Sequence, residues 1–159
     1  MKRLAAENQH CCLLTAQQIE QQPEQSFRHP LNSEALRQTK SLGDAVGLER
    51  LGLHQVRVEP GMASTQFHYH HYEEEFLYIL SGRGIAEIGD AQYEVGPGDF
   101  MGFTAPSLPH SLHNPFAEDL VYLMGGERRE YDVCDYPRIK KRQFRSHNQR
   151  QLVDLTEEV

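Results

Sequence analysis

Three histidines and three glutamates share eight consecutive positions in the segment HYHHYEEE, residues 68–75. Imidazole and charged side chains are rarely buried unless another group pairs with them. An apolar run, FLYIL, follows directly at residues 76–80 and has the character of a buried strand. The segment therefore either forms a solvated edge or delivers nitrogen and oxygen atoms to a site inside the protein.

The spacing of these residues favours a site. Alternate side chains of a strand point to the same face, so we expect His68 and His70 to point the same way. Glu75 opens the next predicted strand, and His110 stands at the start of another, well downstream. Two neighbouring imidazoles, one carboxylate and a remote third imidazole are the ligand types that hold a divalent transition metal.

The neighbouring polar residues are expected to play other parts. His71 and Glu74 have the wrong parity to join the inward set, so we expect them in solvent, and Glu73 is not assigned to the site either. His113 should lie on the opposite face of its strand from His110. The amide of Asn114 is expected to brace a loop.

The chain around this cluster has the texture of an all-β protein. Between residues 49 and 126, short apolar or alternating runs are separated by turns rich in Gly and Pro, which predicts an antiparallel sandwich or barrel. Gly89 and Asp90 lie between two such runs and predict a tight hairpin. Gly61 and Gly82, on either side of the cluster, are expected to let the backbone turn.

Two polar segments flank this predicted barrel. Residues 1–48 form an arm expected to pack on the barrel, with helical pieces at 13–22 and 33–43. Residues 127–159 form a polar C-terminal extension, whose aromatic residues place its first part across the barrel surface. The basic stretch 138–150 either contacts an acidic partner or balances the acidic remainder of the chain, and a solvated stretch is the favoured interpretation.

Composition excludes several classes of function. The net charge of −7 disfavours general binding to nucleic acid or to an anionic membrane, and no run approaches the length of a membrane span. Three cysteines, two of them adjacent, do not make a disulfide framework and predict a reducing, cytoplasmic location. The HCC tract at residues 10–12 has no second cysteine pair downstream, so we do not expect it to bind a metal.

The spacing of the chemical residues closely resembles the first motif of the cupin superfamily, G-x5-HxH-x3,4-E-x6-G. Gly61, His68, His70, Glu75 and Gly82 fill it, with six residues instead of five after the first glycine. The second motif resembles P-x-G-x2-H-x3-N.

The match to that second motif is looser. Its proline, histidine and asparagine are matched by Pro106, His110 and Asn114. Leu108 replaces the glycine of the motif, and one residue is missing before the histidine. The likeness covers roughly residues 50–125, about half the chain. The flanking sequences are similar to those of a group of single-domain bacterial cupins of unassigned function.

The resemblance implies a jelly-roll barrel, the double-stranded β-helix of cupins, around one divalent transition metal such as Zn, Fe, Mn or Ni. Its ligands would be His68, His70, Glu75 and His110. Cupins include dioxygenases, isomerases, epimerases, lyases and decarboxylases, so the fold does not choose the reaction. Glu75 itself or a water on the metal would act as the base.

A small, oxygen-rich molecule such as a sugar, hydroxy acid or dicarbonyl is the expected substrate. Arg83 is the only lysine or arginine between Pro60 and Gly125, so the barrel sequence supplies few cations for a phosphorylated substrate. A sugar-phosphate isomerase is an alternative if Arg128 or Arg129 reaches the site. The candidate pocket walls are Phe67, Leu77, Ile79, Phe100, Phe103, Tyr122 and Met124.

Two further alternatives concern role and assembly. The protein is either an enzyme or a non-catalytic, metabolite-binding or regulatory module. A structural zinc site is less favoured, because such sites prefer closed tetrahedral sets rich in thiolate. We also expect a homodimer, since antiparallel barrels leave edge strands that the arm of a twofold mate would cover.

Overall fold

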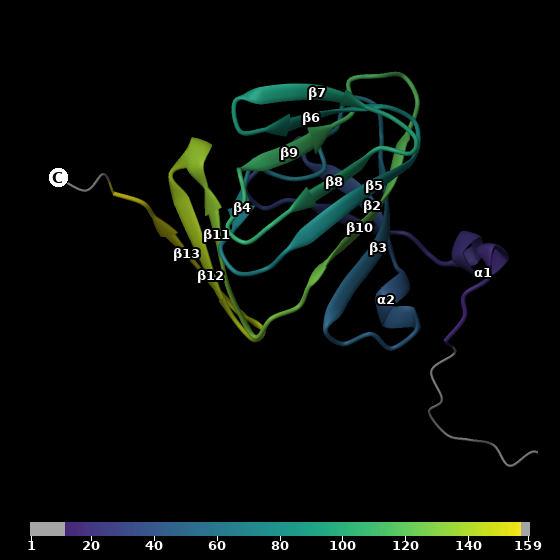
Figure 1. The fold of residues 1–159 in the computed structure, drawn as a ribbon, viewed down its shortest axis with the longest axis horizontal. Helices are drawn as coiled ribbons and strands as arrows, with labels where there is room; N and C mark the ends of the chain where they lie inside the picture. Colours follow the sequence, from purple (N-terminus) through teal and green to yellow (C-terminus); the bar gives the residue numbers. More distant parts are fainter. Residues whose placement is uncertain (1–11, 157–159) are drawn as a thin grey trace, which may run out of the picture.

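The computed structural model describes residues 12–156, most of which lie in antiparallel strands (Figure 1). The predicted all-β class is therefore confirmed. His10 and Cys11 of the HCC tract lie outside the described residues. None of the helices in the described part is long and apolar enough to cross a membrane.

The largest layer is a six-stranded sheet. In spatial order it contains β1 (Gln25–Arg28), β2 (Leu36–Ser41), β3 (Leu51–Val58), β10 (Leu120–Glu127), β5 (Glu75–Ser81) and β8 (Phe100–Phe103). The ladder β3–β10–β5 forms its centre and pairs segments that are far apart in the sequence. The side chains of these central strands alternate between buried and more exposed positions, so one face of the sheet contributes to the core.

A three-stranded sheet supplies the other side of the core (Figure 1). It consists of β7 (Ala91–Val95), β6 (Gly84–Ile88) and β9 (His110–His113). Its Ala86 and Leu112 join the same buried cluster as Val56 and Ile79 of the larger sheet. Burial of each large aliphatic side chain contributes roughly 1.5–3 kcal/mol. No ladder in the described residues joins these two sheets into a closed barrel, so the jelly roll stays a prediction.

The C-terminal extension folds as a meander of three strands, which continues a two-residue strand of the histidine segment. In spatial order this sheet contains β13 (Gln149–Asp154), β12 (Lys141–Ser146), β11 (Tyr131–Tyr136) and β4 (Tyr69–His70), with a short 3-10 turn, η1 (Pro137–Ile139), between β11 and β12. It lies beside the two core sheets in Figure 1. The register pairs Cys134 with His70.

The basic stretch 138–150 is mostly exposed, and several of its arginines balance carboxylates of the same chain. Arg138 binds Glu87 at 2.9 Å, Arg142 binds Asp135 at 2.6 Å, and Arg145 pairs with Glu73. These cations are half-buried or lie against carboxylates of this same chain, because β12 folds back antiparallel on β11.

The N-terminal arm is only partly helical. The first expected helix forms as α1 (Ala16–Gln21), where Thr15 and Gln18 make a reciprocal capping box. The second expected helix, 33–43, is wrong: most of it is strand β2, followed by one short turn, α2 (Leu42–Ala45). Strand β2 gains hydrogen-bonded partners on both sides, β1 and β3, and this tertiary pairing overrides a weak helical propensity.

Glycines make the turns that the sequence predicts. Gly89 has a φ of 59° in the two-residue turn between β6 and β7, as expected for a tight hairpin. Gly61 and Gly82 have φ values of 79° and 74° at the two ends of the histidine segment. The two positions differ in space: a Cβ on Gly61 meets no atom within 4 Å, whereas one on Gly82 collides with the carbonyl of Asp119.

This difference gives a matched pair of substitutions. Gly61→Ala should cost about 1 kcal/mol of unfolding free energy, because only the left-handed backbone is strained. Gly82→Ala should cost roughly 3 kcal/mol or more, because a backbone collision adds to the same strain. Denaturant unfolding of the two variants measures both values, and equal losses would contradict the close approach of Asp119.

A second prediction concerns the contact between the tail sheet and the histidine segment. Asp135 is 4% exposed and accepts hydrogen bonds from Tyr69 at 2.9 Å, from His71 at 3.0 Å and from Arg142 at 2.6 Å. The expectation that His71 lies in solvent is therefore wrong. Burial alone would raise the pKa of Asp135, but these donors hold it at about 2.

Because the pKa is lower in the folded protein than the ordinary value near 3.9, the stabilisation is present above about pH 4 and is lost as the pH falls toward 2. Asp135→Asn should therefore be less stable than the parent protein by roughly 1–2 kcal/mol at pH 7. This difference should shrink steadily below pH 4 in thermal or denaturant unfolding. A difference that does not change with pH would count against the ion pair.

Candidate metal centre

Four side chains named from the sequence meet in the interior. The distances to Glu75 Oε1 are 2.7 Å from His110 Nε2, 3.6 Å from His68 Nε2 and 4.0 Å from His70 Nε2. The two remote segments are tied directly, because His68 and His110 exchange both backbone hydrogen bonds, at 3.1 and 2.8 Å. Glu75 is the first residue of β5. Their role as metal ligands remains a prediction.

The outer nitrogen of each imidazole has a partner that can only accept a hydrogen bond. His68 Nδ1 lies 2.8 Å from the carbonyl of Gln66, and His110 Nδ1 lies 3.2 Å from that of Leu108. His70 Nδ1 lies 2.6 Å from the carboxylate of Asp132. Each Nδ1 must therefore carry a proton, so that in a neutral ring the Nε2 lone pair on the side of Glu75 is the atom left to bind a metal.

This arrangement fits a bound cation. Three imidazole lone pairs and a carboxylate oxygen repel one another unless a proton or a metal ion lies among them. Burial raises the pKa of Glu75, but the hydrogen bonds that His110 and His68 donate through Nε2 when these rings are protonated more than offset it, so the pKa of Glu75 lies well below the ordinary value and the group is ionised. Burial lowers the pKa of His68, which favours its neutral, metal-binding form. Burial also acts to lower the pKa of His70, but the hydrogen bond to Asp132 and the charge of Glu75 more than offset it and raise that pKa.

Packing fixes the direction of the rings. The ring of Phe103 stacks on His110 with centroids 3.5 Å apart and planes 8° apart. His68 and His70 meet edge to face at 5.1 Å. Rings that pack against other rings and are hydrogen-bonded at Nδ1 lose little freedom when an ion binds, which is the usual arrangement around metal-ligating histidines.

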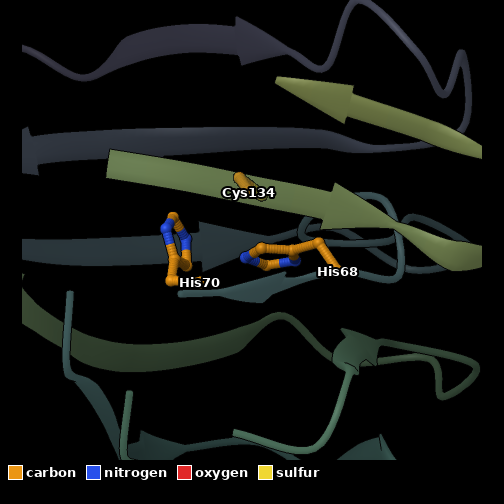
Figure 2. A group of neighbouring side chains, drawn as sticks. All are labelled: His68, His70 and Cys134. Atoms are coloured by element: carbon orange, nitrogen blue, oxygen red, sulfur yellow. The ribbon is translucent and has the colours of Figure 1, made fainter. Parts of the chain in front are cut away.

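The tail sheet adds residues that the sequence did not assign to the site. Figure 2 shows the imidazoles of His68 and His70 below the strand that carries Cys134, and Asp132 stands two residues earlier on the same strand. Burial raises the pKa of the Cys134 thiol to about 12, so it stays protonated near neutral pH. The alternation of Asp132 and Cys134 in YDVCDY is the available signal, whereas the polar composition of residues 127–159 predicts an extension outside the site.

Glu73 is the other residue missed. It is 9% exposed, pairs with Arg145 and accepts the backbone N–H of Arg129 at 2.6 Å. Together with His70 and Asp132 it forms a further group of possible ligands, although its carboxylate is already neutralised by the arginine.

A cavity of about 310 Å³ opens beside the four side chains. Of the predicted pocket walls, four line it: Leu77, Phe103, Tyr122 and Met124. Three do not, for different reasons. Ile79 is 0% exposed in the closed core, Phe100 is 64% exposed on the outer side of β8, and Phe67 lies under the Arg138 guanidinium, 3.8 Å from its ring centroid.

Comparison with known proteins decides the family. Residues 54–126 match the cupin domain family. The structure superposes with a TM-score of 0.90 on a putative sugar phosphate isomerase from Acidithiobacillus ferrooxidans, which is 45% identical, with 93% of this chain and 95% of that chain covered. The chain belongs to the cupin superfamily. The predicted family is therefore confirmed.

Two more cupin comparisons are informative. A sugar phosphate isomerase from a cupin superfamily of Silicibacter pomeroyi is 25% identical, with a TM-score of 0.79 and coverage of 91% of this chain and 97% of that one. An uncharacterized protein of Methanocaldococcus jannaschii is 35% identical over 80 residues. That match covers 50% of this chain and 56% of the archaeal protein, so this cupin spans little more than half the length of that relative.

The second cupin motif has a structural part as well. Asn114 is fully buried, donates to the carbonyls of Val58 at 3.0 Å and Glu118 at 2.7 Å, and accepts the N–H of Phe116 at 3.0 Å. It braces the loop between β9 and β10, which agrees with the expected role. His113 follows His110 on β9, and its backbone pairs with Ile85 of β6.

Asp132 offers a prediction about metal affinity. Its carboxylate fixes the proton on His70 Nδ1, so Asp132→Asn should weaken binding of a divalent transition metal by about 10- to 100-fold. Asp135→Asn is the matched control, because this aspartate lies on the same strand and is equally buried but binds His71. Competition titration with a chelating dye measures both, and equal effects of the two changes would contradict the assignment of Asp132.

Proposed function

We propose that this cupin is a metal-dependent enzyme that acts on a small, oxygen-rich molecule in a jelly-roll cavity. The observation that carries the proposal is the convergence of three imidazole Nε2 atoms on Glu75 Oε1, with every Nδ1 directed at an acceptor. Three nitrogens and one carboxylate suit Zn, Fe, Mn or Ni.

The residues around the ion would divide the work. A divalent ion held by this set polarises a carbonyl or acidifies a water. Glu75 would also accept a proton, as a carboxylate that its surroundings keep ionised. Leu77 and Phe103 provide apolar wall beside it and exclude water, which strengthens electrostatic interactions within the cavity.

A sugar-phosphate isomerase is the second candidate, and two observations favour it. The similar solved structures from Acidithiobacillus ferrooxidans and Silicibacter pomeroyi carry that name, the first as a putative isomerase at 45% identity. The cations that the barrel sequence lacks are supplied by the flanking segments, since Arg37, Arg145 and Arg150 line the cavity.

The arginines expected for that role lie elsewhere. Arg128 binds Asp44 at 2.6 Å and Arg129 binds Glu127 at 3.2 Å, and neither lines the cavity. Assembly as a homodimer and a cytoplasmic location stay predictions.

Elemental analysis of purified protein tests the metal. We expect about one transition metal ion per chain, and a loss of at least about 10-fold in bound metal for His70→Ala and for His110→Ala. His113→Ala, on the same strand as His110, is the control and should keep its metal. Unchanged stoichiometry in the two site variants would contradict the proposal.

Turnover is tested separately with the metal-loaded protein. A panel of sugars, sugar phosphates, hydroxy acids and dicarbonyls, with and without oxygen, should contain at least one substrate whose conversion requires His110. If no member reacts while the metal remains bound and a ligand still binds, the non-catalytic binding module replaces the enzyme.

A further inference from the structure

Arg37 is a half-buried cation at the cavity whose ion-pair partner is missing among residues 12–156. Its Nη1 lies 3.4 Å from the carbonyl of Ser64 and 3.9 Å from the sulfur of Met124, and its guanidinium lies over the Phe27 ring at 4.8 Å. Its Nε is buried without a hydrogen bond. A guanidinium in this setting has N–H donors without acceptors, and the described residues do not neutralise its positive charge.

Two neutral donors line the same cavity. His29 is buried and its Nδ1 accepts the backbone N–H of Leu31 at 3.2 Å, so its proton is on Nε2. Burial lowers the pKa of His29 to about 4, so the ring is neutral near pH 7. Tyr122 is 0% exposed, and its hydroxyl interacts with the side chains of Ser64 and Arg37 without forming a hydrogen bond of standard geometry. A buried hydroxyl without a well-formed hydrogen bond is costly, and a ligand oxygen beside Arg37 would complete its bonding.

The charges that line the cavity leave a surplus. Arg145 is neutralised by Glu73, whereas Asp132 accepts a hydrogen bond from the neutral ring of His70, and its negative charge offsets part of the charge of the proposed cation. Glu75 and the three imidazoles face the proposed cation. Arg37 therefore stays unpaired in the interior, and Arg150 adds an exposed cation at the rim of the same cavity. With a divalent ion in place, this surplus is matched by a ligand that carries two negative charges.

We infer that Arg37, His29 and Tyr122, with Arg150 at the rim, form an anion subsite that holds the phosphate group of a phosphate monoester whose other end reaches the metal. The inference rests on the proposed function, because it assigns the charged end of the same substrate. Guanidinium forks and neutral N–H and O–H donors together satisfy the several acceptor oxygens of a phosphate, whereas a carboxylate has two oxygens and one charge.

Calorimetric titration with inorganic phosphate, on metal-loaded and on chelator-treated protein, tests the subsite without requiring turnover. Arg37→Gln should weaken phosphate binding at least about 10-fold in both preparations, and Arg150→Gln by a smaller factor, about 3-fold. Arg83→Gln is the control: it removes the same charge from an exposed arginine that pairs with Glu94, and it should bind phosphate as the parent does. Acetate should bind more weakly than phosphate.

The outcomes separate the two proposals. If Arg37→Gln does not fold, the test uses Arg37→Lys and the exposed Arg150→Gln instead. Weaker phosphate binding by folded Arg150→Gln supports the subsite. Phosphate binding as in the parent protein by both variants overturns it. The subsite is also overturned if metal-loaded protein does not bind phosphate, or if it binds acetate as tightly as phosphate. Protein that holds no metal but binds phosphate through Arg37 would overturn the proposed function and leave the subsite standing.

Discussion

The structure depends on one electrostatic constraint: three imidazole lone pairs are aimed at a single buried carboxylate oxygen. Each ring is held in that direction by a hydrogen bond at its far nitrogen, to Gln66, Asp132 or Leu108. Without a cation, such a cluster must share protons among groups that all accept them. A divalent ion removes this conflict, and the folded chain is already arranged around the place where it would lie.

The surrounding fold explains how remote residues can meet with that accuracy. The direct bridge between His68 and His110 joins the histidine segment to β9, and the ladder of β5 with β10 fixes Glu75. The tail sheet then closes on the cluster through β11, which pairs with β4 and sets Asp132 behind His70. The C-terminal segment is thus part of the site, because it orients a ring that the two core sheets alone leave unsupported.

The sequence predicts those parts of this arrangement that depend on strand alternation and on glycine turns. Alternation placed His68 with His70 and turned Glu75 inward, and the glycines of the motif have the positive φ values expected of them. It failed where pairing between distant segments decides the outcome. Residues 36–41 became strand because β1 and β3 flank them, and Asp132 entered the site because β11 pairs with β4.

The cavity walls show the same limit. Parity correctly separated buried from exposed positions on β5, yet Ile79 is buried too far along its strand to reach the cavity. The cations come from outside the barrel: Arg37 from β2 and Arg150 from β13. No spacing rule connects these residues to the HxH segment, because the contact is created only when the arm and the tail fold against the core sheets.

The most direct test of the central claim is X-ray absorption at the metal edge of the purified protein. The geometry predicts a first shell of about three imidazole nitrogens with carboxylate or water oxygen near 2.0–2.2 Å, and the multiple-scattering pattern of histidine rings. Asp132→Asn should change this ligand shell, whereas Asp135→Asn should leave it unchanged. A shell without imidazole, or one with sulfur near 2.3 Å from Cys134, would contradict the account.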